Sequence, residues 1–219
     1  MLTLAVEAST YTGSVAIIRD GVVIAERDTA MRGEHEERLM PAVADALHAA
    51  AVSPNDIGRI VCGEGPGSFT SLRIAAAIAK GLAMTTQAPL HAVSSLFLLV
   101  AGARASLMPG RYVAVLDAMR GDVFAAVFSV ADDVVTPESS ASIVARTDVA
   151  AFAHEHSGRL IGPEESLAAF PHARGAALVD ASPAIARAVD LATWEPNYGR
   201  LAEAQVRWEA THGRALIPR

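Results

Sequence analysis

The sequence opens each of its two halves in the same way, and this repetition constrains the fold more than any other feature. The segment "LAVEA" at residues 4–8 resembles "AVLDA" at residues 114–118, so that Glu7 corresponds to Asp117 and Ala8 to Ala118. Each segment is followed by a short polar turn and a second apolar strand. Self-similarity of this kind indicates an internal duplication. The alternative is that two hydrophobic hairpins resemble each other by chance.

Strand patterns and helix patterns alternate along the chain, which favours an α/β architecture. We expect strands at 2–9, 59–65 and 89–95, and hairpins at 13–29 and 111–130, the first of them turning at Asp20–Gly21. Helices are expected in the segments 33–52, 71–86, 95–107, 146–156, 182–192 and 202–213, the segment 182–192 being entered through Ser182–Pro183. Leu39, Val43 and Leu47 repeat at helical spacing in the first of these, where Pro41 displaces or kinks the first turn.

Composition narrows the class of function. The chain has 219 residues and a formal net charge of −6, and 52% of its residues are hydrophobic. The net negative charge argues against nucleic-acid binding as the main function, because such binding needs a basic patch. The apolar excess predicts a buried partner face. The single cysteine excludes an internal disulfide, and the N-terminus lacks a basic leader, so we expect a soluble cytoplasmic protein.

The segment "GEGPGS" at residues 63–68 looks like a phosphate-binding loop but lacks the other residues that the known phosphate-binding motifs require. No Lys follows the last glycine, as a Walker-type loop requires, and the spacing fits neither a dinucleotide fingerprint nor a nucleophile elbow. We therefore predict a tight turn leading into a helix capped by Ser68 or Thr70. An anion at the helix N-terminus is the alternative. Asp117, Arg120 and Asp122 form either a metal–phosphate group or a polar turn.

The helix "SLRIAAAIAKGLAMTT" at residues 71–86 is small or apolar on nearly every side. A helix of this kind is buried on every side. We expect one side to pack on the core of this chain and the other on a partner. The alternative is a central helix that lies wholly inside the chain.

Several of these segments together resemble one known family. "GPGSFTSLRIAAAIAKGLA", "VSSL", "LDAMRGDVFAAVF", "HEERLMPAV" and "PNYGRLAEAQVRWE" are similar to the TsaB (YeaZ) family, the dimerisation subunit of the bacterial complex that makes threonylcarbamoyladenosine in tRNA. The resemblance implies an actin-like, Hsp70-like (ASKHA) α/β fold of two duplicated βββαβα-type lobes. We expect the N-terminal lobe at 1–104, joined by a C-terminal helix at 198–219, and the C-terminal lobe at 105–197.

The resemblance also implies a role without catalysis. The family binds a larger catalytic paralogue, TsaD, and a small ATPase, TsaE, joins them, so contact with tRNA is expected only through the complex. Ser95 and Leu99 stand where the catalytic paralogue carries its metal-binding histidines, Glu7 stands where the family usually has Asp, and Ser71 where it usually has Gly. We therefore expect a degenerate paralogue with no catalytic residue, cofactor or metal of its own.

The family further implies a four-helix bundle at the partner interface, with two helices from each subunit. The free chain is then expected to form a homodimer through the same face. Some of the apolar residues on these helices must face the core instead. The candidate contacts are Leu39, Val43, Leu47, Leu72, Ile74, Ala75, Ile78 and Leu82.

Two other functions compete with this scaffold. A small ATPase or kinase of the same fold would use Glu7 and Asp117 at the ends of the duplicated strands. A peptidase function has the least support, because the sequence shows no recognisable spacing of a Ser-His-Asp triad or of metal ligands.

Overall fold

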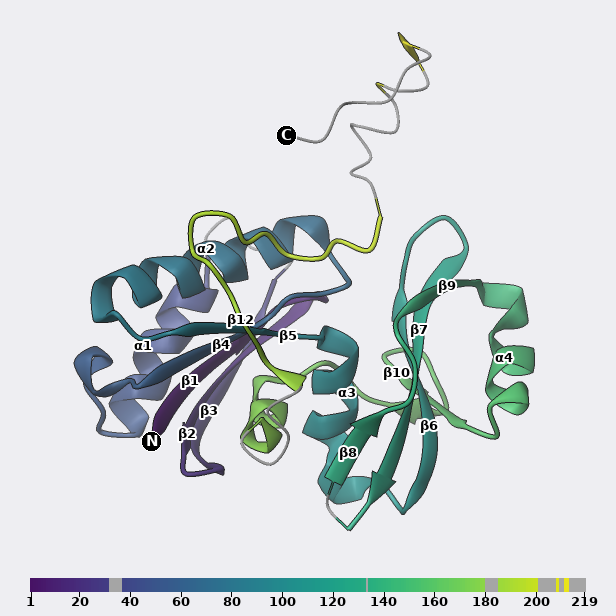
Figure 1. Cartoon of the computed structure of the whole chain (residues 1–219), viewed down its shortest axis with the longest axis horizontal. Coiled ribbons are helices and arrows are strands. Elements are labelled where there is room, and N and C mark those ends of the chain that lie inside the picture. The colour runs from purple at the N-terminus through teal and green to yellow at the C-terminus, as the bar shows by residue number, and fades with distance from the viewer. Residues whose placement is uncertain (32–36, 133, 180–184, 201–207, 209–210, 213–219) are drawn as a thin grey trace.

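Two mixed β-sheets with helices between and around them form the body of the protein (Figure 1). The computed structural model describes residues 1–31, 37–132, 134–179, 185–200, 208 and 211–212. Each sheet has six strands within this part of the chain. The α/β class expected from the sequence is therefore confirmed.

The first sheet has the order β12-β5-β4-β1-β2-β3. Its opening hairpin turns at Asp20 and Gly21, whose φ angles of 50° and 79° suit the tight two-residue turn that joins twisted strands. Its strands are β1 (Leu2–Glu7), β2 (Thr12–Arg19), β3 (Val22–Ala30), β4 (Arg59–Gly63), β5 (Leu90–Val93) and β12 (Arg187–Ala188).

Two helices, α1 (Leu39–Ala49) and α2 (Phe69–Thr86), share one apolar cluster with this sheet and cover one of its faces. Pro41 is the third residue of α1, within the first turn, where a missing N–H removes no helical hydrogen bond. The expected late start of this helix is therefore confirmed. The short 3₁₀ segment η1 (Pro54–Asp56) lies between α1 and β4.

The second sheet repeats the topology of the first. β1 pairs antiparallel with β2 and parallel with β4, and β6 pairs antiparallel with β7 and parallel with β10. The duplication predicted from Glu7 and Asp117 is thus a duplication of structure, because these residues end β1 and β6. The strands are β6 (Gly110–Asp117), β7 (Asp122–Ala131), β8 (Val134–Pro137), β9 (Ser142–Ala145), β10 (Arg159–Gly162) and β11 (Leu167–Ala168), and α4 (Val149–Glu155) packs on this sheet.

The helix α3 (Ser95–Ala103) lies between the two sheets and forms the centre of the molecule (Figure 1). All residues from Ser95 to Ala101 are buried, because the helix is apolar on every side and meets apolar side chains from both sheets. Three 3₁₀ segments complete the described elements: η2 (Arg104–Ser106), η3 (Arg146–Asp148) and η4 (Ala173–Leu178).

The helix expected at 182–192 is wrong over its described residues. Arg187 and Ala188 form β12, which pairs antiparallel with His91 and Ala92 of β5, so an open sheet edge overrides local helical propensity. Ser182 and Pro183 lie outside the described residues. β12 also belongs to the first sheet, although the expected boundary places 187–188 in the second lobe. The two sheets define two lobes, and the exact residue bounds of these lobes otherwise stay a prediction.

The C-terminal helix expected at 202–213 falls mostly outside the described residues. Trp208, Thr211 and His212 are described and helical, and the Trp208 and His212 rings stack with centroids 4.3 Å apart. The predicted return of this segment onto the first lobe stays untested.

Candidate functional site: an interlobe cleft and an apolar helical face

The carboxyl group of Glu7 is buried at the end of β1 and is held by its own chain. The Ser9 N–H donates to Oε1 at 2.5 Å, and the Ser95 hydroxyl donates to Oε2 at 2.8 Å. Burial raises the pKa of Glu7, and the hydrogen bonds from Ser9 and Ser95 offset only part of this effect. Glu7 is therefore a structural acid that ties β1 to the first turn of α3.

The glycine-rich loop at residues 63–68 is held by hydrogen bonds to the same Ser95. Ser95 Oγ accepts a hydrogen bond from the Gly65 N–H at 3.1 Å, and Gly65 O accepts one from the Ser95 N–H at 2.9 Å. Gly65 adopts φ = 98°, and a Cβ there would lie 2.2 Å from the Asn197 carbonyl oxygen. The loop thus needs glycine for backbone contacts inside the chain.

The helix start after this loop is confirmed at Phe69, but the predicted side-chain cap is wrong. Ser68 occupies the N-cap position without a side-chain capping bond, and its hydroxyl lies 3.1 Å from that of Ser71. The Ser68 N–H instead donates to Ser9 O at 2.7 Å. The loop is therefore docked on the residues that follow β1.

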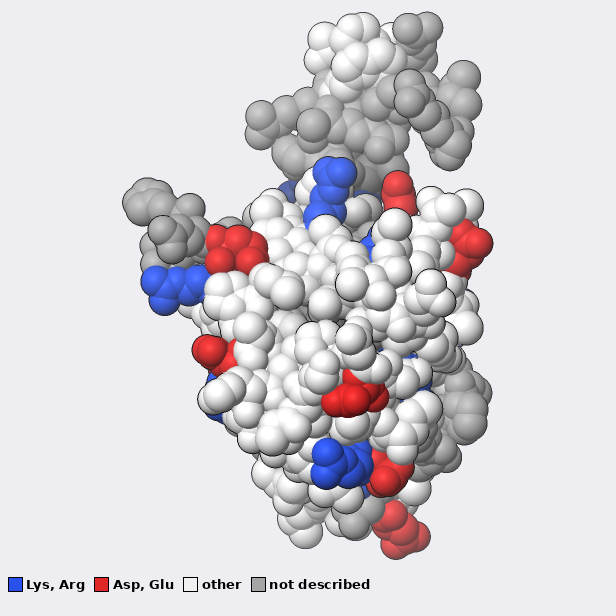
Figure 2. All heavy atoms as spheres, turned by 90° about the vertical axis from the view of Figure 1, so that its left-hand side faces the viewer, with Lys and Arg blue, Asp and Glu red and all other residues white. Residues whose placement is uncertain are grey.

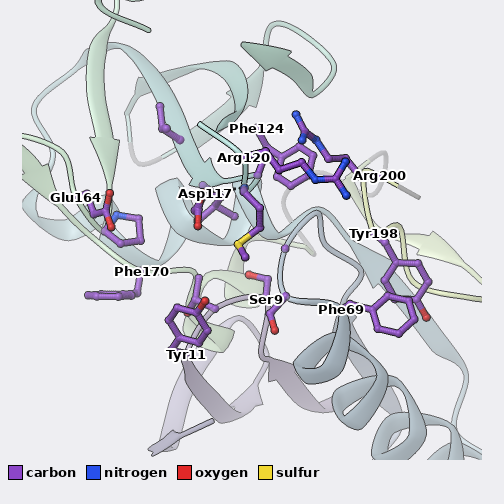
Figure 3. Close-up of a pocket in the computed structure, with 18 of the residues that line it drawn as sticks. Ser9, Tyr11, Phe69, Asp117, Arg120, Phe124, Glu164, Phe170, Tyr198 and Arg200 are labelled. Carbon is purple, nitrogen blue, oxygen red and sulfur yellow. Dashed lines mark hydrogen bonds between the residues drawn. The ribbon is translucent and has the colours of Figure 1, made fainter. Parts of the chain in front are cut away.

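A cleft of about 660 Å³ opens between the two lobes (Figure 3). Its volume lies in the range of small-molecule sites. The first lobe contributes the residues after β1 and the start of α2, and the second contributes the ends of β6, β7 and β10. The aromatic residues along its walls are Tyr11, Phe69, Phe124, Phe170 and Tyr198.

The turn between β6 and β7 projects into this cleft. Met119, Arg120 and Gly121 all have positive φ angles, of 63°, 60° and 81°, and Asp117 Oδ1 accepts a hydrogen bond from the Met119 N–H at 2.9 Å. Asp117 and Arg120, two of the three residues singled out in the sequence, line the cleft, and Asp122 pairs with Arg200 at its edge. The polar-turn interpretation thus describes this group.

Glu7 does not line the cleft, so the structure separates the two acids that end the duplicated strands. Ser95 and Leu99, at the positions of the paralogue's histidines, are completely buried in α3, with Leu99 in the central apolar cluster. In the described part of the chain, no three His, Cys, Asp or Glu side chains gather in a way that could hold a metal ion.

Burial sorts the eight candidate interface residues into two groups. Ile74, Ile78 and Leu82 are partly exposed along one side of α2, at intervals of one helical turn. The other five are corrected to buried positions, because each is at most 7% exposed in this chain. These core residues are Leu39, Val43, Leu47, Leu72 and Ala75.

The outward face of α1 and α2 includes several small residues, although Asp45 and Arg73 are also exposed on these helices. Ala44 of α1 and Ala77 and Gly81 of α2 are exposed, while Met40 and Met84 are 41% and 71% exposed. This surface excludes the hypothesis that α2 lies wholly inside the chain. Figure 2 shows the side of the molecule that carries these helices, with a broad uncharged area and charged side chains mostly around it.

Comparison with known proteins agrees with this architecture. The model of the family "TsaD: tRNA N6-adenosine threonylcarbamoyltransferase" matches residues 26–173, more than half of the chain. A solved structure from Pseudomonas aeruginosa, described as similar to the peptidase YeaZ, superimposes with a TM-score of 0.77 at 26% identity, covering 91% of this chain and 99% of the other. YeaZ from the same organism has a TM-score of 0.72 at 25% identity, with 89% and 98% covered.

Curated relatives carry a more specific description. The "tRNA threonylcarbamoyladenosine biosynthesis protein TsaB" of Bacillus subtilis is 39% identical over 128 residues, which is 58% of this chain and 55% of the relative. The protein of the same description from Escherichia coli is 39% identical over 124 residues, 57% of this chain and 53% of the relative. The chain thus spans about half the length of the curated relatives it matches.

Two duplicated lobes around a cleft define a protein of the actin-like, Hsp70-like (ASKHA) class. The chain belongs to the TsaD family, and within it to the TsaB (YeaZ) group. Among the helices that the structure describes, none combines the length and the apolar character needed to cross a membrane.

The cleft itself was missed from the sequence. Tyr11, Phe124, Phe170 and Tyr198 come from separate elements, and each looks like an ordinary core or surface aromatic in its own segment. Only the duplication offered a signal, since paired strand ends in two lobes must face each other across a gap.

Proposed function

We propose that this chain is a non-catalytic subunit that supports threonylcarbamoyl transfer to the adenosine beside the anticodon of tRNA. It does so by binding and stabilising a TsaD-type catalytic subunit, with a TsaE-type ATPase joining the complex. Family membership supports the pathway. The proposal places the chain in the cytoplasm, where tRNA is found.

One observation carries the non-catalytic part of the proposal. Ser95 and Leu99 have no exposed surface, and Ser95 is engaged by Glu7 and Gly65. Neither side chain is a useful ligand for a transition metal, and neither can reach one without unfolding α3. The position that carries the metal pair in the catalytic paralogue is thus used here to build the core.

The partner face of this proposal is the outward side of α1 and α2. Small residues at Ala44, Ala77 and Gly81 allow a second pair of helices to approach closely. The partly exposed row of Ile74, Ile78 and Leu82 supplies apolar area beside them. In the absence of the catalytic subunit, we propose that two copies of this chain cover the same face.

Reconstitution tests the proposal. The chain, a TsaD-type subunit, a TsaE-type subunit and tRNA are combined with the activated threonylcarbamoyl donor, and the modified nucleoside is measured by mass spectrometry. We expect product only when the catalytic subunit is present together with this chain. Product formed by this chain alone would refute the non-catalytic role.

A substitution on the face separates binding from folding. Ala77→Arg places a charge on the exposed side of α2, and Ala151→Arg makes the same change on the exposed side of α4, in the other lobe. We expect Ala77→Arg to abolish co-purification of the catalytic subunit and to leave the thermal midpoint near that of the unmodified chain. Equal capture by both variants would show that the face is misplaced.

The competing ATPase function finds less support. It needs two acids facing one cleft, but Glu7 is buried and hydrogen-bonded away from it. Metal-dependent ATP turnover that is lost on Asp117→Ala would nevertheless favour an enzyme over a scaffold.

A further inference from the structure

The segment before the C-terminus runs as a strap over the first lobe and ends between the two lobes (Figure 1). It starts at β12, where Arg187 Nη2 also pairs with Glu64 Oε2 at 2.8 Å. Trp194 then packs into the cluster under α2, and the Lys80 side chain donates to its carbonyl oxygen. Up to this point every one of these contacts is made within the first lobe.

Residues 197–200, which follow shortly after Trp194, are inserted between the lobes at the edge of the cleft. The Asn197 N–H donates to Glu64 O at 2.7 Å, and the Tyr198 ring contacts that of Phe69, with centroids 4.5 Å apart. Both contacts hold this segment on the loop and the first residue of α2. Tyr198 and Arg200 are themselves part of the cleft wall (Figure 3).

Gly199 brings the same segment against the second lobe. Its φ angle is 69°, and a Cβ there would lie 2.4 Å from the Phe124 ring of β7 and 2.9 Å from Pro66 of the first lobe. No side chain fits between these two walls. The backbone therefore fills the space between the lobes only because this residue is glycine.

Arg200 completes the bridge with a charge. Its guanidinium donates to the carboxylate of Asp122, the first residue of β7. The Arg200 and Asp122 side chains are 22% and 32% exposed, so the pair is only partly screened by water. The backbone of residue 197 is thus bonded to the first lobe and the side chain of residue 200 to the second.

We propose that residues 197–200 act as a latch that sets the opening of the interlobe cleft. Two lobes joined through a central helix can rotate about it, and hinge motions of this kind are limited by contacts at the open end. The latch provides such contacts on the cleft side, opposite α3. Breaking the Arg200–Asp122 pair releases the second lobe, while the strap stays paired with β5.

Spin-label distance measurements on the full chain test the latch. Val22→Cys on β3 and Ala151→Cys on α4 carry one label in each lobe, because both positions are exposed and neither lies on the outward face of α1 and α2. The native Cys62 is buried in β4, and burial raises the pKa of its thiol, so it does not compete for the label. The labelled pair reports the distance distribution between the lobes.

We expect Asp122→Asn and Arg200→Gln each to increase the fraction of molecules with a longer distance, by up to about fivefold. High salt should have a smaller effect of the same sign on the unmodified latch. The matched control is Arg187→Gln, which breaks an ion pair of the same strap within the first lobe and should leave the distribution unchanged.

Two results would overturn the latch. One is a distribution for Asp122→Asn and Arg200→Gln that superimposes on that of the unmodified chain. The other is a control variant that broadens the distribution as much as they do, which would show general loosening of the strap. Thermal midpoints measured on the same samples show that each variant is folded.

Discussion

Gly63 and Glu7 should behave as one coupled unit, which makes Gly63→Ala the sharpest test of the buried carboxylate. A Cβ at position 63 would lie 1.7 Å from Glu7 Oε2, 2.7 Å from its carboxyl carbon and 3.2 Å from Ser95 Oγ. The carboxylate would have to move by more than an ångström. That movement breaks its 2.8 Å contact with Ser95 and strains its contact with the Ser9 N–H.

The expected cost follows from these losses. Overpacking a close-packed core typically costs 1–3 kcal/mol, and each lost hydrogen bond adds about 1 kcal/mol. We therefore expect Gly63→Ala to lower the free energy of unfolding by about 3 kcal/mol. For a chain of this length, such a loss corresponds to a fall of roughly 6–12 °C in the thermal midpoint, measured by circular dichroism.

A second substitution in the same pair gives the decisive control. Glu7→Asp shortens the side chain by one methylene and withdraws the carboxylate from position 63. In the Gly63→Ala background it should recover part of the lost stability, whereas alone it should destabilise by loosening the contact with Ser95. Strictly additive effects in this double-mutant cycle would refute direct contact as the cause.

Three further predictions follow from single residues. The pKa of Glu7 is raised in the folded chain, so the native state keeps a proton that the unfolded state loses above the ordinary glutamate pKa of 4.5. The contribution of Glu7 to stability therefore falls as the pH rises above that value. Glu7→Gln should flatten this decline, measured by urea unfolding between mildly acidic and mildly basic pH. Leu99→Ala should cost about 2–5 kcal/mol, measured by the same unfolding curves, and a loss under 1 kcal/mol would contradict its place in the core. Met119→Asn should raise stability by roughly 1 kcal/mol, because asparagine tolerates the φ of 63° at this turn, and an unchanged or lower midpoint would count against strain there.

Much of the architecture could be predicted from local pattern. The hairpin at Asp20–Gly21, the strand before Gly63 and the spacing of Leu39, Val43 and Leu47 each appear in the structure where the sequence indicated. These are local signals, because turn chemistry and side-chain period depend only on neighbours in the chain. The helix expected around Arg187 failed for the opposite reason, since its backbone pairs with β5, almost a hundred residues away.

The sequence by itself determined the duplication, the strand ends at Glu7 and Asp117, and the apolar character of α2, because each of these features depends only on the pattern of residues close together in the chain. Only the tertiary structure decided which apolar residues are core: Leu72 and Ala75 are buried while Ile78, one turn further along α2, is partly exposed. It also decided that Glu7 lies outside the cleft and that Arg200 meets Asp122 at the edge of the cleft. Such contacts join segments far apart in the chain, and no local preference encodes their distance.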